Sequence, residues 1–179
     1  MIRLGVLGST RGTDLQAILD AIQNHTLDAE VVVVVSNRNK SYILERARHH
    51  NIPDVFVSQK GKTRDEFDRE ITATLLQHGA DLVLLIGFMR ILSAEFCQKW
   101  HDRILNVHPS LLPKYAGGMD NDIHEEVLRN GDVETGCTIH FVTEEVDAGP
   151  ILIKKKCTVA GKDTVESLKT KVQQLEGMA

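Results

Sequence analysis

The sequence predicts an α/β fold in which helices cover a mainly parallel sheet. Short apolar runs of strand length alternate with longer stretches whose apolar residues recur at three- and four-residue spacing. Such alternation is typical of repeated β-α units. The apolar runs are also continuous, as the five consecutive valines at residues 31–35 show, so we expect both faces of the strands to be covered.

Each run before Pro109 is assigned to one element. Buried strands are predicted at residues 2–7, 29–36, 54–57, 81–86 and 103–107. Crossover helices are predicted between them, at residues 14–24, 42–50, 64–78 and 93–100. This order predicts a Rossmann-like, three-layer α/β/α arrangement, with helices on each side of the sheet.

After Pro109 the pattern changes. A loop without periodicity runs to Asp122, and loops of this length in compact domains are often functional. One helix and two strands of alternating character follow, at residues 124–129, 134–142 and 151–159. The two strands predict an antiparallel C-terminal extension. A last helix begins near Thr164 and shows no capping signal before the chain ends, so we expect a missing or disordered C-terminal segment.

Length and charge limit the classes of protein. With 179 residues and 42% hydrophobic content, the chain is expected to form one domain over residues 1–179, with halves at 1–107 and 108–179. The 21 basic and 25 acidic side chains leave a net charge of -4. Binding to nucleic acid requires a broad cationic face, so nucleic acid is not an expected partner.

Cysteine usage and hydropathy predict a cytoplasmic location. The three cysteines are far apart, and none belongs to a C-x-x-C pair or to a zinc pattern with histidine, so we expect reduced thiols and no bound metal. The N-terminal apolar run is too short for a signal peptide, and no apolar span of about 18 residues follows. No membrane is therefore expected as a partner.

The first turn, Gly-Ser-Thr-Arg-Gly-Thr-Asp at residues 8–14, is a candidate phosphate site. A helix is predicted to start there, and a helix N-terminus presents unpaired N–H groups and partial positive charge. The turn lacks the glycine spacing of a dinucleotide site and the Gly-Lys-Ser/Thr of a P-loop, so a mononucleotide-like phosphate fits better. The alternative is that Gly12 relieves a tight turn while Thr13 or Asp14 caps the helix.

The fifth predicted strand ends in Asn106-Val107-His108-Pro109-Ser110, a candidate catalytic segment. Ligands of open α/β sheets lie outside the carboxyl ends of the strands, and strand alternation points Asn106 and His108 to the same side. An amide and an imidazole there can stabilise an oxyanion and transfer a proton. The alternative is a hydrogen-bonded histidine at a strand end. A metal site is disfavoured, because no second ligand stands at the required spacing.

Asp147 lies just before Gly149-Pro150, which forces a turn between two apolar strands. A carboxylate held there beside His108 is expected to raise the pKa of the imidazole and to orient its ring. The alternative is a solvated acidic turn that also contains Glu144 and Glu145.

Two more segments can bind ligands. Residues 87–92 follow the fourth strand, and their apolar side chains can line a pocket for a flat heteroaromatic ligand or belong to the core. Arg64 opens a predicted helix and can clamp a phosphate, or remain an exposed guanidinium near Asp65 and Asp68.

Three segments together resemble the phosphoribosylglycinamide formyltransferase family, and the resemblance extends over nearly the whole chain. They are Gly-Phe-Met-Arg-Ile-Leu at 87–92, Asn-Val-His-Pro-Ser-Leu-Leu-Pro-Lys at 106–114, and His-Phe-Val-Thr at 140–143 with Asp147 and Gly149-Pro150. The resemblance implies transfer of a formyl group from the cosubstrate 10-formyltetrahydrofolate to the amine of 5'-phosphoribosylglycinamide, in purine biosynthesis. It also implies the formyltransferase fold, with a phosphate-binding first half and a folate-binding second half.

The resemblance also assigns the site residues. The catalytic residues are Asn106, which would hold the oxyanion, His108, which would donate a proton or hydrogen bond to it, and Asp147, which would keep the imidazole charged. The residues expected to bind the phosphoribosylglycinamide are Gly12, Thr13, Asp14, Arg64, Gln173, Gln174, Leu175 and Glu176. The residues expected to bind folate are Met89, Arg90, Ile91, Leu92, Asn106, Thr143, Glu144, Glu145, Val146 and Asp147.

Three other functions are weighed against this one. Formyltetrahydrofolate hydrolase shares the Asn-x-His-Pro-Ser segment but usually carries an extra N-terminal domain, and methionyl-tRNA formyltransferase needs an RNA-binding domain and a more basic surface. A sensor that binds folate or nucleotide without turnover is the third, and the presence of Asn106, His108 and Asp147 disfavours it. All partners expected are small molecules, and both a monomer and a homodimer stay open.

Overall fold

The computed structural model describes residues 1–179, apart from the side chain of Asp120. The chain divides into two compact units, Met1–Asn106 and Val107–Ala179. No helix in the described residues is long and apolar enough to cross a membrane.

The first unit is built on parallel strands. These are β1 (Ile2–Gly8), β2 (Ala29–Ser36), β3 (Asp54–Phe56), β4 (Leu82–Ile86) and β5 (Ile104–His108), the last of which continues into the second unit. Their order in the sheet is β3-β2-β1-β4-β5, and every neighbouring pair is parallel. The predicted mainly parallel sheet is confirmed.

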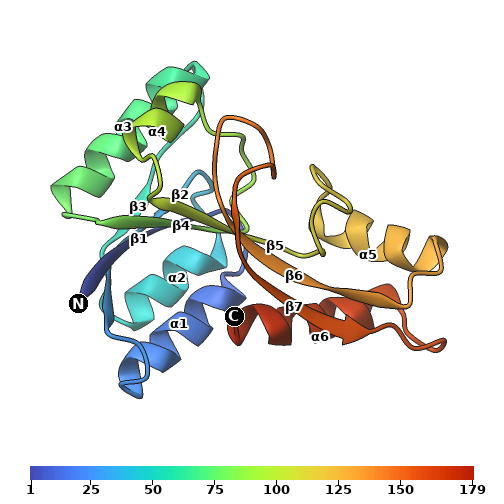
Figure 1. Cartoon of the computed structure of the whole chain (residues 1–179). Helices are drawn as coiled ribbons and strands as arrows, with labels where there is room; N and C mark the ends of the chain where they lie inside the picture. The colour runs from blue at the N-terminus through green and yellow to red at the C-terminus, as the bar shows by residue number, and fades with distance from the viewer. The chain divides into compact units, whose positions relative to one another are not determined.

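Four helices complete this unit, α1 (Thr13–Gln23), α2 (Tyr42–His49), α3 (Arg64–Gln77) and α4 (Ala94–Lys99). Figure 1 shows α1 and α2 on one face of the sheet and α3 and α4 on the other. The predicted three-layer arrangement is therefore confirmed. The α3 helix starts at a capping box, in which Thr63 accepts from the Glu66 N–H and Glu66 accepts from the Thr63 N–H, so two backbone donors of the helix terminus are satisfied.

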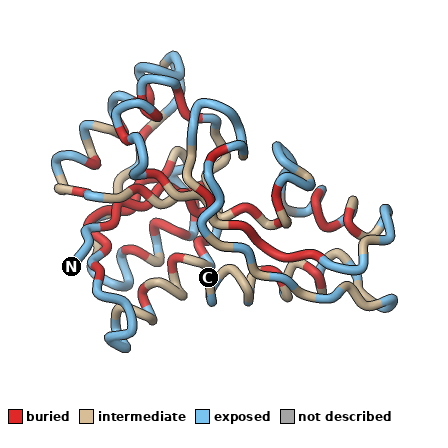
Figure 2. Tube along the Cα trace, viewed as in Figure 1, coloured by how far each residue is buried: buried red, intermediate tan, exposed pale blue. Residues whose placement is uncertain are grey.

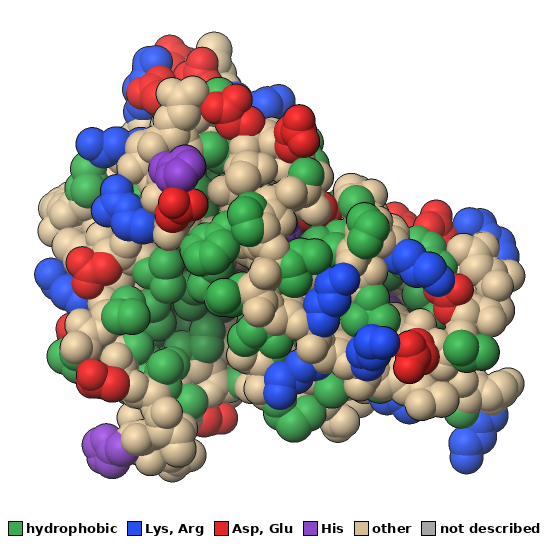
Figure 3. All heavy atoms as spheres, viewed as in Figure 1, with side chains coloured by type: hydrophobic (Ala, Val, Ile, Leu, Met, Phe, Trp, Pro, Cys, Tyr) green, Lys and Arg blue, Asp and Glu red, His purple; other side chains and the backbone are tan. Residues whose placement is uncertain are grey.

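Burial is complete at the middle of this sheet and weaker towards β5 (Figure 2). Val33, Val34 and Val35 of β2 are each 0% exposed, as the continuous apolar runs predict. On the face that carries α1 and α2, however, Leu84 of β4 and its partner Leu105 of β5 stay partly exposed. Hydrophobic side chains are accordingly visible over this part of the first unit in Figure 3. These two side chains are less buried than those in the middle of the sheet.

The second unit contains α5 (Asp120–Arg129), β6 (Glu134–Phe141), β7 (Ile151–Thr158) and α6 (Val165–Gly177). The strands β6 and β7 pair in antiparallel register, which confirms the predicted extension. The two helices pack on each other through Ile123, Val127 and Leu168. The α5 helix starts four residues before the predicted position, because Asn121 and Asp122 form its first turn and acidic residues are favourable there.

The loop after β5 is anchored to β6 by one buried hydroxyl group. Thr138 is 0% exposed; its Oγ1 accepts from the Leu112 N–H at 3.1 Å and donates to the Ser110 carbonyl at 2.7 Å. From β7, Lys154 Nζ donates to the Leu112 carbonyl. The segment that follows His108 is thus fixed in position by both strands of the hairpin.

We expect Thr138→Val to lower the free energy of unfolding by about 1–3 kcal/mol, because it leaves a buried N–H and a buried carbonyl without this partner. Thr138→Ser keeps the hydroxyl group and is the matched control. Urea titration of both variants and the wild type measures the difference, and equal stabilities of the two variants would refute the anchoring role.

Candidate active site

His108 and Asp147, the two titratable residues predicted to be catalytic, meet in the second unit. His108 is the last residue of β5 and is buried. Its Nδ1 lies 3.4 Å from Oδ2 of Asp147, whose side chain is 11% exposed. The alternative of a solvated acidic turn is therefore wrong for Asp147, although Glu144 and Glu145 beside it are exposed.

The β6-β7 connection holds Asp147 in an unusual backbone conformation. Its φ is 54°, in the left-handed region that non-glycine residues rarely adopt. The Gly117 N–H donates to Asp147 Oδ2 at 2.8 Å. A Cβ added to Gly149 would lie 1.8 Å from the Phe141 carbonyl oxygen, so the turn that carries Asp147 requires glycine at this position.

His140 is a third member of the cluster, and it carried no predicted role. It is 1% exposed; its Nε2 lies 3.5 Å from Asp147 Oδ1 and its Nδ1 lies 2.9 Å from the Phe141 carbonyl. The available signal was strand alternation, since Thr138 and His140 are both polar and both lie on the buried side of β6. One carboxylate is thus shared between two histidines.

Each histidine has oxygen acceptors at both ring nitrogens. His108 Nε2 lies 3.1 Å from the Tyr115 carbonyl while Nδ1 faces Asp147, and His140 faces Phe141 and Asp147 in the same way. A neutral imidazole has a single N–H and can satisfy only one acceptor. The site can therefore accommodate an additional proton on either ring without moving its partners.

Burial disfavours protonation of the His108 ring. Burial lowers the pKa of His108 below its ordinary value, while Asp147 and the Tyr115 carbonyl act in the opposite direction and His140 lowers it further. Asp147 does raise the imidazole pKa, as predicted, but it does not keep the ring charged, because the cost of burying the charge exceeds the attraction. The resting pair is a neutral imidazole beside a carboxylate.

Asp147 itself stays ionised. Burial raises the pKa of its carboxyl group, but the hydrogen bond with His140, the Gly117 N–H and the two nearby histidines outweigh burial, and the net shift is downward. The arrangement supplies a proton acceptor of fixed orientation and an N–H donor next to it, which is what acid-base chemistry at a carbonyl carbon requires.

In the first unit, Gly12 sets the start of α1. It is the N-cap residue with φ 66°, no side chain caps the helix, and α1 begins at Thr13. The alternative in which Thr13 or Asp14 caps the helix is therefore wrong. A Cβ on Gly12 would lie 2.4 Å from Ile43 Cγ1, so glycine is required by space as well as by φ. The α1 helix therefore starts without a side-chain cap.

The loop at 87–92 is held by a chain of hydrogen bonds that joins the carboxyl ends of four strands. The Met89 N–H donates to Ser9 Oγ at 2.9 Å, and Ser9 donates to Asn37 Oδ1 at 2.6 Å. Gln59 Oε1 accepts from Asn37 Nδ2 at 3.2 Å and from Arg90 at 2.5 Å. Ser9 belongs to the candidate phosphate turn at 8–14, whereas Asn37 and Gln59 were missed, although Asn37 directly follows a predicted strand, where ligand-binding residues are expected.

Comparisons with known proteins agree with this geometry. The chain matches the family described as Formyl transferase over residues 2–179. The chain belongs to the formyl transferase family. It is 40% identical over 172 residues to phosphoribosylglycinamide formyltransferase of Escherichia coli (strain K12), covering 96% of this chain and 80% of that protein.

Longer relatives contain the same region as a part. The trifunctional purine biosynthetic protein adenosine-3 of Chironomus tentans is 42% identical over 99% of this chain, which spans 13% of that protein. The human protein of the same name is 41% identical over 97% of this chain, which spans 17% of it. The chain therefore corresponds to a small share of these relatives.

Solved structures show the same fold. Glycinamide ribonucleotide transformylase 1 from Symbiobacterium toebii has a TM-score of 0.95 and 39% identity, covering 99% of this chain and 83% of that one. A formyltetrahydrofolate deformylase from Pseudomonas syringae has a TM-score of 0.89 and 27% identity, covering 99% of this chain and 58% of that one. The predicted formyltransferase fold is confirmed.

The remaining predicted residues of this formyl transferase lie in several places. Arg64 is exposed at the start of α3 and interacts with the buried Asp68. Burial raises the pKa of Asp68, although the Ser93 hydrogen bonds, Arg90 and Arg64 lower it. Among the described contacts, none joins Arg64 to residues 12–14. Residues 173–176 form part of the last turns of α6, and Val146 is 49% exposed beside Asp147.

Among the residues whose side chains are described, no group of three or more His, Cys, Asp or Glu is arranged to hold a metal ion. The cluster around Asp147 contains two histidines and one carboxylate, but their closest atoms are already paired with one another or with backbone carbonyls.

We expect the free energy of unfolding to decrease on acidification below about pH 6.5, the ordinary pKa of histidine in an unfolded chain. Because the pKa of His108 is lowered in the folded protein by burial, against Asp147, the unfolded state takes up a proton first, and stability is lost until the pH reaches the folded pKa. Urea titrations between pH 5 and 8 measure how the free energy of unfolding changes with pH. This range extends about one to two units on each side of the pKa of histidine in the unfolded chain.

His108→Gln is expected to make this slope shallower. His101→Gln is the control, since His101 has a side chain 78% exposed. An unchanged slope in His108→Gln, with Asp147 and His140 still in place, would contradict the assignment of a buried neutral ring.

Proposed function

We propose that this chain transfers the formyl group of 10-formyltetrahydrofolate to the amine of 5'-phosphoribosylglycinamide, a step of purine biosynthesis. The observation that carries the proposal is the buried pair of His108 and Asp147 at the end of β5, in a chain that is 40% identical to a phosphoribosylglycinamide formyltransferase. Both substrates are small molecules, and folate acts as a cosubstrate.

The proposed reaction needs no covalent bond to the protein. The neutral amine attacks the formyl carbon, a new C–N bond forms, and the carbonyl oxygen takes the negative charge. The bond from this carbon to N10 of the folate then breaks; the amine loses one proton and N10 gains one. None of the three cysteines is required, and Cys97 and Cys137 are buried.

The catalytic residues act on charge and protons. The Asn106 amide and an N–H of His108 would donate to the oxyanion as it forms, which is usually the largest contribution to such catalysis. His108 starts neutral because it is buried, and negative charge that develops on the oxyanion would add to the effect of Asp147 in favouring a charged ring. Asp147, held ionised by its partners, would receive the amine proton through water.

Other residues would bind the two substrates. We assign the phosphate to the α1 N-terminus at Gly12, Thr13 and Asp14, where the helix has no side-chain cap. By family resemblance Arg64 would assist, and residues 173–176 would contact the ribose and glycinamide. Folate would bind along residues 89–92 and 143–147 together with Asn106. The expected cytoplasmic location and a monomeric or homodimeric state stay predictions.

We expect the wild-type chain to form formylglycinamide ribonucleotide from the two substrates, and His108→Ala and Asp147→Asn to reduce the rate by about a hundredfold or more. Two exposed positions supply matched controls, His101→Ala and Asp28→Asn, with side chains 78% and 86% exposed. Circular dichroism checks that all four variants fold.

Two outcomes would overturn this proposal. Release of formate at full rate without the glycinamide acceptor would identify a hydrolase, the activity named for the Pseudomonas syringae relative. Binding of both substrates without turnover would identify a sensor.

A further inference from the structure

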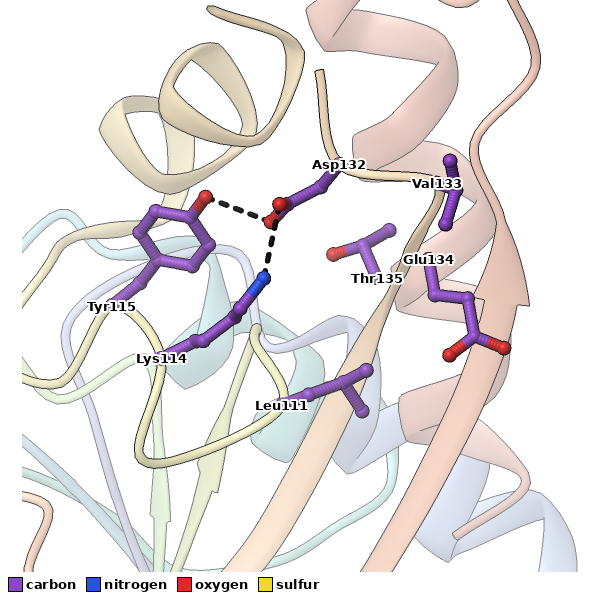
Figure 4. A pocket seen from close by; sticks show the side chains of 7 residues that line it. All are labelled: Leu111, Lys114, Tyr115, Asp132, Val133, Glu134 and Thr135. Atoms are coloured by element: carbon purple, nitrogen blue, oxygen red, sulfur yellow. Dashed lines mark hydrogen bonds and ion pairs between the residues drawn. The ribbon is translucent and has the colours of Figure 1, made fainter. Parts of the chain in front are cut away.

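A second polar cluster lies close to the His108–Asp147 pair, and the proposed reaction does not use it. Asp132, in the turn between α5 and β6, accepts from the Tyr115 hydroxyl at 2.8 Å and from Lys114 Nζ at 3.0 Å. Asn130 Nδ2 donates to the same hydroxyl at 2.9 Å. Figure 4 shows Lys114 and Tyr115 both directed at Asp132.

Lys114, Tyr115 and Asp132 border a pocket of about 230 Å³. Leu111, Val133, Glu134 and Thr135 complete its lining. Its charged groups are already paired, Lys114 with Asp132 and Glu134 with Lys156. The pocket therefore gives no argument for a ligand, and the cluster is better explained by what it holds in place.

Tyr115 is the residue that the cluster holds, and its backbone is strained. Its φ is 60°, which is uncommon for a bulky side chain and persists only where the surroundings enforce it. The ring packs beside Ile123, Val127 and Leu168, while the hydroxyl is fixed by Asp132 and Asn130. Both ends of the side chain are thus restrained.

The short segment that begins at Tyr115 contacts both members of the catalytic pair. The Tyr115 carbonyl lies 3.1 Å from His108 Nε2, and it also accepts from the Gly118 N–H at 3.1 Å. Two residues along, the Gly117 N–H donates to Asp147 Oδ2 at 2.8 Å. A shift of this segment would change the environment of His108 and Asp147 together.

We propose that Asp132 is a positioning residue for His108. Through the Tyr115 hydroxyl it fixes a backbone carbonyl at Nε2, so that the ring has an oxygen acceptor there as well as Asp147 at Nδ1. A neutral ring has one N–H, for which the ionised carboxylate is the stronger acceptor, and only a protonated ring donates at both nitrogens; the carbonyl therefore favours protonation of His108. The inference rests on the proposed function, in which His108 stabilises the oxyanion.

The test uses three variants of the network. Tyr115→Phe removes the hydroxyl and keeps the ring, Asp132→Ala removes the acceptor, and Asp132→Asn keeps an amide oxygen that can still accept from Tyr115. Glu134→Gln is the control, because Glu134 lines the same pocket and pairs with Lys156 instead. The measurements are ¹⁵N NMR of the His108 ring without ligands, and kcat and KM for formyl transfer.

We expect Tyr115→Phe and Asp132→Ala to make His108 harder to protonate, so that its ¹⁵N signals change at a lower pH than in the wild type. The same two variants should lower kcat by about tenfold to a hundredfold, the loss typical of a misplaced catalytic group, with KM for either substrate changed by less than about twofold, as expected when only transition-state interactions are lost. Asp132→Asn should keep the His108 spectrum and kcat close to those of the wild type, and Glu134→Gln should match the wild type in both.

An unchanged His108 spectrum in Tyr115→Phe and Asp132→Ala would overturn the proposal, even if both variants are less stable, because the cluster would then serve stability alone. If the wild type transfers no formyl group, the proposed function fails by itself. The NMR measurement is made without substrates and would still decide whether Asp132 supports protonation of His108.

Discussion

The Asp147 carboxylate is the group on which the rest of the second unit's site depends. It faces His108 and His140 with one oxygen each and accepts the Gly117 N–H. A buried carboxylate without such partners would be costly and would become protonated. Because His108, His140 and the Gly117 N–H all stabilise its negative charge, the carboxylate stays ionised. The same side-chain contacts help to maintain the strained φ of 54° at Asp147.

Two opposing effects act on the pKa of His108, and their balance decides whether the ring is charged. Asp147 favours the charged ring, while burial disfavours it more strongly. In the proposed reaction, negative charge that develops on the formyl oxygen would act in the same direction as Asp147 and offset part of the cost of burying a charged ring. The ring would then be stabilised more in the transition state than in the ground state, as catalysis requires.

The sequence was sufficient for the elements whose pattern is local. Runs such as residues 31–35 and the alternation in β6 and β7 identify strands, and the turn at Gly149-Pro150 places Asp147 at a strand end. It was insufficient where a property depends on residues far apart in the chain. The pKa of His108, the partial exposure of Leu84, and the joining of Ser9, Asn37 and Gln59 all depend on packing between elements.

The same distinction explains why His140 and Asp132 are hard to identify from a single sequence. His140 occupies an ordinary inward position of a strand, and Asp132 follows Asn130-Gly131, where an acidic residue is common in any turn. Their importance comes from what they contact: His140 shares the Asp147 carboxylate with His108, and Asp132 accepts from the hydroxyl of Tyr115, whose carbonyl faces His108. The site around His108 therefore depends on polar residues such as His140 and Asp132, whose contacts are created only when the second unit folds.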